Sequence, residues 1–236
     1  RIEVEVVKSA DSKFAAGDKE LFRVNRGDLE IGYQGRRIRA NATFYNTSWH
    51  LEQIFPLDGE GAEAVARVNR IFHRDTAAMR RGTFLREGDA LPNFGMIDQG
   101  GAFVQIKDLE GKPFVMNFIF TRCQMPTMCP ASSTKMEALQ EKAREADLSD
   151  LQFVTVSFDP AYDSPGILRT YAQGYGIELE NFQLLTHSQE LIDDLLRQVG
   201  ILTIEEDGTI NHTMATLLID AAGRIAHREE GPNWKV

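Results

Sequence analysis

Hydrophobic and polar residues alternate over much of the first 58 residues, which is the pattern of strands with one buried face. The alternation is clearest in Ile2–Val6, partial in Leu21–Val24, and Trp49–Pro56 is typical of another short strand. Leu29–Tyr33 and Ile38–Phe44 flank Gln34 and Gly35, so we expect these two segments to pair as a hairpin across that turn.

The period changes at residues 60–80, where apolar residues recur at helical spacing. This stripe is formed by Val65, Val68, Ile71 or Phe72, and Met79. We therefore expect residues 1–82 to form a small β-rich domain, a barrel or a sheet, closed by this helix. The polar, glycine-containing segment from Arg81 to Asp89 is typical of a linker.

Residues 83–236 have a different rhythm, in which short apolar strands alternate with helices. Asn93–Ile97 and Phe103–Ile106 form a predicted hairpin, and Phe114–Phe120 is apolar enough for a strand covered on both faces. Further strands are expected at Phe153–Phe158, Phe182–Leu185, Thr216–Asp220 and Arg224–His227, with helices at Ala131–Ala146, Pro165–Tyr175 and Gln189–Val199. Alternation of this kind predicts an α/β fold with a central sheet flanked by helices.

The chain is acidic, with 26 Lys and Arg against 35 Asp and Glu and a net charge of −9. This balance argues against non-specific binding to nucleic acid, which requires clustered cations. No apolar stretch approaches the roughly 18 residues that a membrane-spanning helix requires. We expect neither nucleic-acid binding nor direct membrane insertion by these residues.

The two cysteines, Cys123 and Cys129, lie between a predicted buried strand and the helix after it. Ligands bind at the carboxyl ends of strands in α/β folds. Pro130 fixes the helix start, so we expect Cys129 to be the N-cap residue, where free amides and the helix dipole favour a thiolate. Thiolates are both nucleophiles and ligands of soft metals.

Other residues with metal-binding side chains lie near the cysteines. Met125 and Met128 place two thioethers in the same loop, and thiolate with thioether selects Cu(I). The alternative is that both methionines pack the loop against the sheet. His212 precedes a predicted strand whose start reaches the same sheet edge, where it would complete a Cys-Cys-His site, unless it is an exposed loop histidine. We interpret the other histidines as surface or packing residues: His50, His73, His187 and His227.

Four segments in this order resemble the SCO copper-chaperone family, over about residues 86–233. They are Gly88–Phe94, Gly111–Pro113 leading into Asn117–Cys123, Ser157–Pro165, and Asn211–Thr213 before Leu217–Asp220. The resemblance implies a thioredoxin-like fold, with Cys123, Cys129 and His212 as copper ligands and the cysteines as a redox-active pair. The chain departs from the family in having five residues between the cysteines, where three are usual.

The resemblance also implies a function: delivery of copper to the copper-binding subunit of a respiratory oxidase, outside the cytoplasmic membrane, with any tether in a segment outside this sequence. The main alternative is a thiol–disulfide oxidoreductase that keeps the cysteines of another thiol protein reduced. That chemistry usually has two residues between the cysteines, and the cis-proline normally opposite them is replaced by Asn211–Thr213. A peroxiredoxin is disfavoured, because Pro126 stands where a threonine is needed. A non-catalytic module stapled by a disulfide would leave the methionines and His212 unexplained.

Two further features are open to alternative interpretations. Asp159 and Asp163 suit either a cap for the helix that begins at Pro165 or a partner-docking role. The N-terminal domain lies outside the resemblance. We interpret it as a docking or spacing domain, with a second metal-handling module built from Trp49, His50 and Met79 as the alternative.

Overall fold

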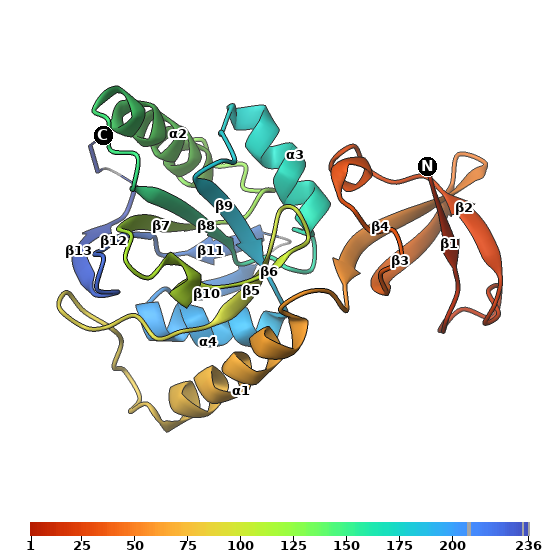
Figure 1. Cartoon of the computed structure of the whole chain (residues 1–236), viewed down its shortest axis with the longest axis horizontal. Helices are drawn as coiled ribbons and strands as arrows, with labels where there is room; N and C mark the ends of the chain where they lie inside the picture. The colour runs from red at the N-terminus through yellow and green to blue at the C-terminus, as the bar shows by residue number, and fades with distance from the viewer. Residues whose placement is uncertain (207–208, 233, 236) are drawn as a thin grey trace.

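The computed structural model describes residues 1–206, 209–232 and 234–235. Figure 1 shows a larger part, in which helices cover a central sheet, and a smaller N-terminal part made of strand pairs beside it. The mixed α/β fold with a β-rich N-terminal part confirms the predicted fold class.

The central sheet has seven strands in the order β13-β12-β7-β8-β9-β5-β6. β7, β8 and β9 are parallel to one another, and the remaining pairs are antiparallel. All six residues of β7 are buried, as its continuous apolar sequence predicts. The bounds are β5 (Gly95–Asp98), β6 (Phe103–Gln105), β7 (Phe114–Ile119), β8 (Gln152–Ser157), β9 (Phe182–Thr186), β12 (Ala215–Ile219) and β13 (Ile225–Glu230).

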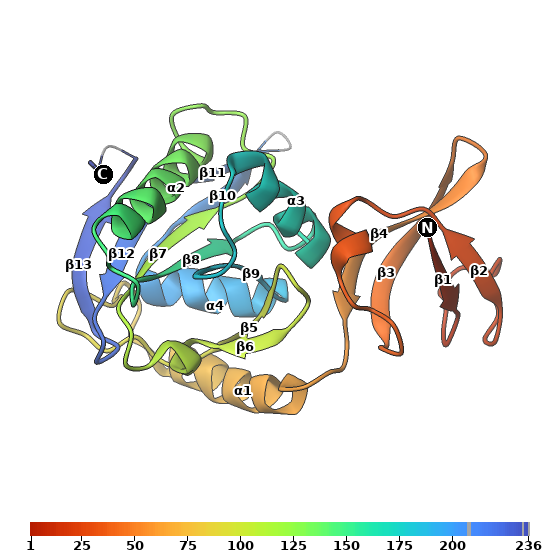
Figure 2. The same cartoon turned by 45° about the horizontal axis from the view of Figure 1, so that its top comes forward.

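Helices cover both faces of this sheet, α2 and α3 on one side and α1 and α4 on the other (Figures 1 and 2). α2 and α3 pack on Val115, Phe153 and Phe182. α1 and α4 contribute to a separate core cluster with Phe94 and Met96. The bounds are α1 (Ala62–Ala78), α2 (Cys129–Glu145), α3 (Pro165–Tyr175) and α4 (Gln189–Val199). The bounds of α3 and α4 are those predicted from the sequence, because a proline or serine at one end and a glycine at the other limits each helix.

The helix expected to close the N-terminal strands packs elsewhere. The main contacts of α1 are with α4, β5 and β6. Its buried residues Val65 and Phe72 face this part, where Phe72 lies 5.4 Å from the ring of Phe94 and Val65 fills the space above Gly95. The expectation was wrong on this point, because a helical stripe shows that a helix buries one face but not which surface receives it.

The N-terminal part is neither a closed barrel nor a single sheet. β1 (Ile2–Glu5) pairs with β2 (Lys19–Phe22), and β3 (Ile38–Tyr45) pairs with β4 (Ser48–Pro56), with one bridge between Arg23 and His50 connecting the two pairs. Phe22, Ile31, Tyr33, Leu51 and Ile54 form its small buried core.

The predicted hairpin across Gln34 and Gly35 is wrong. Gly27–Glu30 forms the 3-10 helix η1, and β3 turns into β4 at Asn46 and Thr47 instead. Both of these residues have positive φ, 46° and 60°, as a two-residue hairpin turn with the sheet's twist requires. Asparagine tolerates this conformation, but threonine rarely adopts it, which hides the turn in the sequence.

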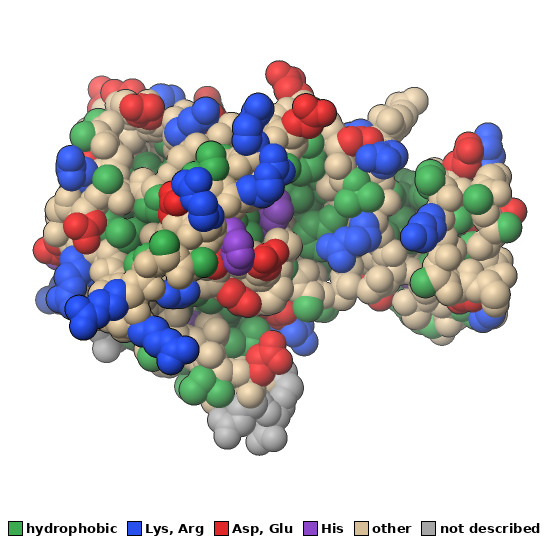
Figure 3. Space-filling model, turned by 90° about the horizontal axis from the view of Figure 1, so that it is seen from below, with side chains coloured by type: hydrophobic (Ala, Val, Ile, Leu, Met, Phe, Trp, Pro, Cys, Tyr) green, Lys and Arg blue, Asp and Glu red, His purple; other side chains and the backbone are tan. Residues whose placement is uncertain are grey.

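The N-terminal part is docked on the start of α3. Gly27 and Gly166 approach so closely that a Cβ atom on Gly27 would lie 1.9 Å from the Gly166 carbonyl oxygen. Next to this contact, Glu30 accepts a hydrogen bond of 2.8 Å from Arg169. A groove of about 930 Å³ remains between the two parts, lined by β4, α1 and the start of α4 (Figure 3).

Candidate metal centre

The cysteine loop runs from the end of β7 to the start of α2. Two backbone turns shape it, through hydrogen bonds from Cys123 N to Phe120 O (3.3 Å) and from Met128 N to Met125 O (3.0 Å). α2 begins at Cys129 with Met128 as its N-cap, one residue before the predicted cap, and Pro130 lies in the first turn. Cys129 therefore points from the first turn of a helix that is packed on the sheet.

His212 lies on a strand rather than in the expected loop. β10 (Thr203–Glu206) and β11 (Thr209–His212) form a hairpin in which His212 is opposite Thr203. The histidine ring packs against Phe158 and Phe120, at centroid distances of 4.7 and 5.8 Å. Its Nδ1 lies 3.0 Å from the Thr213 carbonyl oxygen, so Nδ1–H is the donor and the Nε2 lone pair is free for a ligand.

The three predicted ligand residues meet at one point. Cys129 Sγ lies 3.5 Å from His212 Nε2, and the ligand atoms of Cys123, Cys129 and His212 are all within 4.8 Å of one another. Both cysteines are free thiols. In the part of the chain that the structure describes, this is the one group of three or more His, Cys, Asp and Glu side chains that could hold a metal ion. Two sulfur atoms and one imidazole nitrogen form a donor set for a soft metal.

Burial differs between the two cysteines and controls their chemistry. Cys129 is fully buried, whereas Cys123 is partly exposed at the surface of the loop. Burial raises the pKa of the Cys129 thiol, and this outweighs the lowering expected from the helix dipole. Burial also lowers the pKa of His212, which keeps the imidazole neutral at pH 7, the form that binds metals.

The two methionines lie in the same loop with different exposure. The side chain of Met125 is 56% exposed, while Met128 is half-buried at the N-cap of α2. Their role as additional ligands stays a prediction.

Sequence reasoning missed how the cysteine loop is held. Asp163 was expected either to cap α3 or to serve partner docking, but its buried carboxylate reaches across to the residues before Cys123. It accepts hydrogen bonds from the Thr121 backbone N–H (3.0 Å), the Thr121 hydroxyl (2.5 Å) and the Ser157 hydroxyl (2.5 Å). Burial raises the pKa of Asp163 to about 6. The N-cap of α3 is Ser164, with no side-chain cap hydrogen bond.

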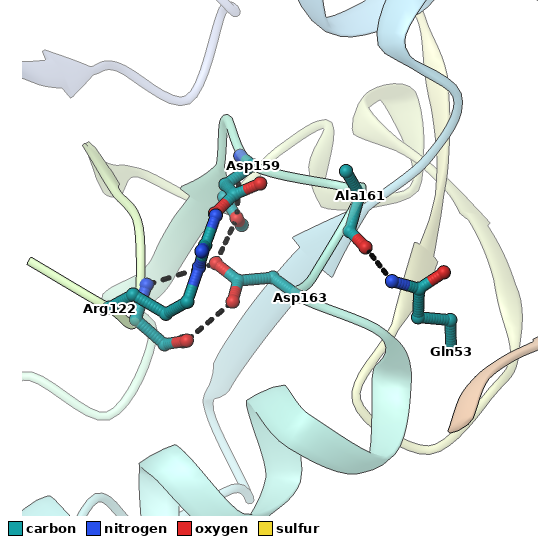
Figure 4. A network of polar contacts seen from close by, with 7 residues as sticks. Gln53, Arg122, Asp159, Ala161 and Asp163 are labelled. Carbon is teal, nitrogen blue, oxygen red and sulfur yellow. Dashed lines mark hydrogen bonds and ion pairs between the residues drawn. The ribbon is translucent and has the colours of Figure 1, made fainter. Parts of the chain in front are cut away.

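Arg122, next to Cys123, is held by the same loop (Figure 4). Its guanidinium donates to the Asp159 carboxylate at 2.6 and 3.0 Å and lies 4.8 Å from the centre of the Tyr162 ring. Asp159 and Asp163 thus fix consecutive residues, Arg122 and Thr121. The sequence shows two aspartates after a strand that ends at the same sheet edge as the cysteine loop. It does not indicate that Arg122 and Thr121 are their hydrogen-bond partners.

The other histidines lie away from this cluster. His73 Nδ1–H donates a 2.7 Å hydrogen bond to the Asp194 carboxylate, and burial lowers the pKa of His187 to about 4. His50 stacks on Tyr45 at 3.9 Å, and His227 forms ion pairs with Glu87 and Glu229. Trp49 packs against Phe14 and Phe44 and is followed by His50 on the same strand, β4, whereas Met79 ends α1. The residues of the suggested second module therefore come from two separately packed elements.

A sheet flanked by helices, with one cysteine in the loop after a central strand and a second at the start of the next helix, defines a thioredoxin-like protein, here with a histidine completing a metal-type cluster. The SCO1/SenC family profile matches residues 85–231, more than half of the chain. The chain belongs to the SCO1/SenC family, as its motifs predicted.

Individual relatives agree with this assignment. The crystal structure of a SCO1/SenC family lipoprotein from Bacillus anthracis is 32% identical, with a TM-score of 0.58, and covers 64% of this chain and 90% of that chain. A SCO1 protein homolog from Bacillus subtilis is 28% identical over 136 residues, 56% of this chain and 69% of the relative. Protein SenC from Rhodobacter capsulatus is 28% identical over 149 residues, 61% of this chain and 65% of the relative.

None of the described helices is both long and apolar enough to cross a bilayer.

Proposed function

We propose that this protein is a copper metallochaperone of the SCO type, which holds one copper ion through Cys123, Cys129 and His212 and delivers it to a respiratory oxidase copper centre. The observation that carries the proposal is the convergence of two free thiols and a neutral imidazole within 4.8 Å of one another. A putative copper-binding protein from Stutzerimonas stutzeri is 26% identical over 148 residues, which supports copper as the cargo.

The different exposure of the ligands suits transfer as well as binding. Cys129 is buried at the start of a helix, so it acts as the fixed ligand, while the partly exposed Cys123 is the ligand that an acceptor can replace first. Both thiols lose a proton on binding, so affinity rises with pH. Oxidation of the pair to a disulfide would remove both thiolates at once, so loading requires the reduced protein.

The acceptor and the location are inferred from relatives. The solved structure of BsSco, a member of the Sco family of cytochrome c oxidase assembly proteins, is 25% identical with a TM-score of 0.55. The Bacillus anthracis relative is a lipoprotein. We place this chain outside the cytoplasmic membrane, tethered to it, with the copper-binding subunit of an oxidase as its partner.

Anaerobic copper titration of the fully reduced protein tests the proposal. We expect one tight equivalent, retained against a chelator, and a sulfur-to-copper charge-transfer band with Cu(II). Cys123→Ser, Cys129→Ser and His212→Ala should each lose it, while His227→Ala, a histidine outside the cluster, should keep it. Weak binding in the wild type, or binding unchanged in His212→Ala, would refute this site.

Thiol–disulfide exchange is the second candidate, supported by two free thiols close to one another. In this reaction a partner disulfide is reduced to two thiols, while Cys123 and Cys129 lose two electrons and two protons and form a disulfide. Turnover of a peptide disulfide by a variant that binds no copper, such as His212→Ala, would favour this function.

A further inference from the structure

One contact joins the N-terminal part to the loop that holds the cysteine segment. The Gln53 side chain on β4 donates a hydrogen bond from Nε2 to the carbonyl oxygen of Ala161 (Figure 4). Ala161 lies between Asp159 and Asp163, the two residues that bind Arg122 and Thr121. Gln53 lies outside residues 85–231, so the family assignment says nothing about it.

The local backbone shows why Gln53 reaches this loop. Arg39 pairs with Phe55 and Asn41 pairs with Glu52, so β4 contains one residue more than β3 over this interval. This is a β-bulge, a feature that re-aims a side chain. Gln53 has φ of +53°, a costly conformation for a residue other than glycine. Asn41 Nδ2 donates to Gln53 Oε1 at 2.6 Å, which turns the amide N–H₂ toward Ala161.

A second contact fixes the other end of the same loop. Asp163 is followed by Ser164 and by α3, whose Gly166 packs against Gly27 and Asp28 of η1. The N-terminal part therefore touches the loop at its centre and just beyond its end. Asp159 and Asp163 then accept hydrogen bonds from Arg122 and Thr121, the two residues that precede Cys123.

We infer that Gln53 is a positioning residue for Cys123: the N-terminal part anchors loop 159–163, and this loop holds the cysteine segment in place to keep the Cys123 sulfur beside Cys129 and His212. Strain at the bulge and the oriented amide are the features that this role explains. The effect of Gln53 on the accessibility of the Cys123 thiol can be measured in the metal-free protein. Its effect on copper release rests on the proposed function.

The first test measures alkylation of Cys123 by iodoacetamide in the reduced, metal-free chain of 236 residues. A Cys129→Ser background leaves Cys123 as the single thiol, since the chain has two cysteines. Loss of one hydrogen bond in the anchor should raise the alkylation rate about threefold in Gln53→Ala, and loss of the direct clamp in Asp163→Ala about tenfold.

Two further variants separate positioning from folding. Gln53→Glu keeps the acceptor for Asn41 but loses the donor to Ala161, so it should raise the rate as Gln53→Ala does. Glu52→Gln, at the exposed neighbouring position, should leave the rate unchanged. Thermal midpoints are recorded for all variants, and alkylation is measured well below the lowest midpoint, so that every variant is compared in its folded state. An unchanged rate in both Gln53 variants, with a raised rate in Asp163→Ala, overturns the role of Gln53.

The second test uses copper and distinguishes failure of this inference from failure of the proposed function. With Cys129 restored, Gln53→Ala should release copper to a chelator about threefold faster than the wild type. If the wild type binds no copper while the alkylation rates change as expected, the proposed function fails and the positioning role stands. If copper binds tightly and neither alkylation nor release responds to Gln53, the positioning role fails alone.

Discussion

The two parts of this molecule differ in how completely their side chains are buried. The seven-stranded sheet is covered on both faces and contains the fully buried side chains Phe118, Phe153 and Phe182. The N-terminal part has two separate strand pairs, a small core, and aromatic residues such as Phe44 that remain exposed. The metal-type cluster of Cys123, Cys129 and His212 lies entirely in the larger part, while the N-terminal part contacts loop 159–163, which holds the cysteine segment. The rigid packing of the larger part thus places the ligand residues, and the N-terminal part is suited to adjusting the position of Cys123.

The chain offers a probe for each part. Its two tryptophans are Trp49, packed against the N-terminal core, and Trp234, buried in the cluster with Val115 and Phe153. Single-tryptophan variants therefore report the unfolding of each part separately.

The largest expected effect comes from the core of the sheet. Phe153 is fully buried and stacks on Phe182 at 5.5 Å. Phe153→Ala should lower the free energy of unfolding by about 3–5 kcal/mol, because it leaves a cavity. Urea unfolding should show the loss in the Trp234 signal and a smaller one in the Trp49 signal. Equal losses in both signals would mean that the two parts unfold as one unit.

A pH effect on the N-terminal part is expected from Asp28. Burial raises the pKa of Asp28 from 3.8 to about 6, so the folded state binds the proton more tightly than the unfolded state. This contribution is therefore fully present below about pH 4 and is lost as the pH rises to about 6, by up to about 3 kcal/mol.

Asp28→Asn keeps an acceptor for Tyr33 and cannot ionise, so its Trp49-detected stability should fall less than that of the wild type between pH 4 and 6. The exposed Glu3→Gln serves as the control. Parallel pH profiles for wild type and Asp28→Asn would contradict the assignment of this proton to Asp28.

Adding a single methyl group at Gly166 should disrupt the contact between the two parts. A Cβ on Gly166 would lie 2.2 Å from Asp28 Oδ1, so Gly166→Ala should weaken the docked state by about 2 kcal/mol. Gly174→Ala on the same helix meets no atom within 4 Å and should be stabilising by about 0.5–1 kcal/mol. During urea unfolding, Trp49 fluorescence measures the effect of Gly166→Ala and Trp234 fluorescence that of Gly174→Ala. A Gly166→Ala protein with wild-type stability would show that the docking contact is absent in solution.

The smallest effect is expected in the cysteine loop itself. Met125 is more than half exposed, so Met125→Leu should change copper affinity by less than about threefold if the two thiolates and the imidazole suffice. Competition with a Cu(I) chelator measures this. A tenfold loss in Met125→Leu, with no loss in a Leu202→Met control at the exposed position just before β10, would establish Met125 as a further ligand.

Local patterns predicted most of the larger part. A continuous apolar run encoded β7, helix-limiting residues encoded α3 and α4, and proline after Cys129 placed the start of α2 within one residue. The N-terminal part was predicted less well, because Leu29–Tyr33 alternates like a strand but forms η1 and an extended segment, and because Thr47 occupies a turn position that its side chain disfavours.

The sequence alone determined the elements of the sheet and the three residue types of the metal-type cluster, because periodicity, prolines and family motifs are local properties. Tertiary structure decided which surface received α1, which partner β3 paired with, and how deeply Cys129 was buried, so that its thiol pKa rose instead of falling. It also decided that Asp163 would bind Thr121 and that Gln53 would reach Ala161. These contacts join residues far apart in the chain, and their energies depend on burial and orientation that exist only once the chain has folded.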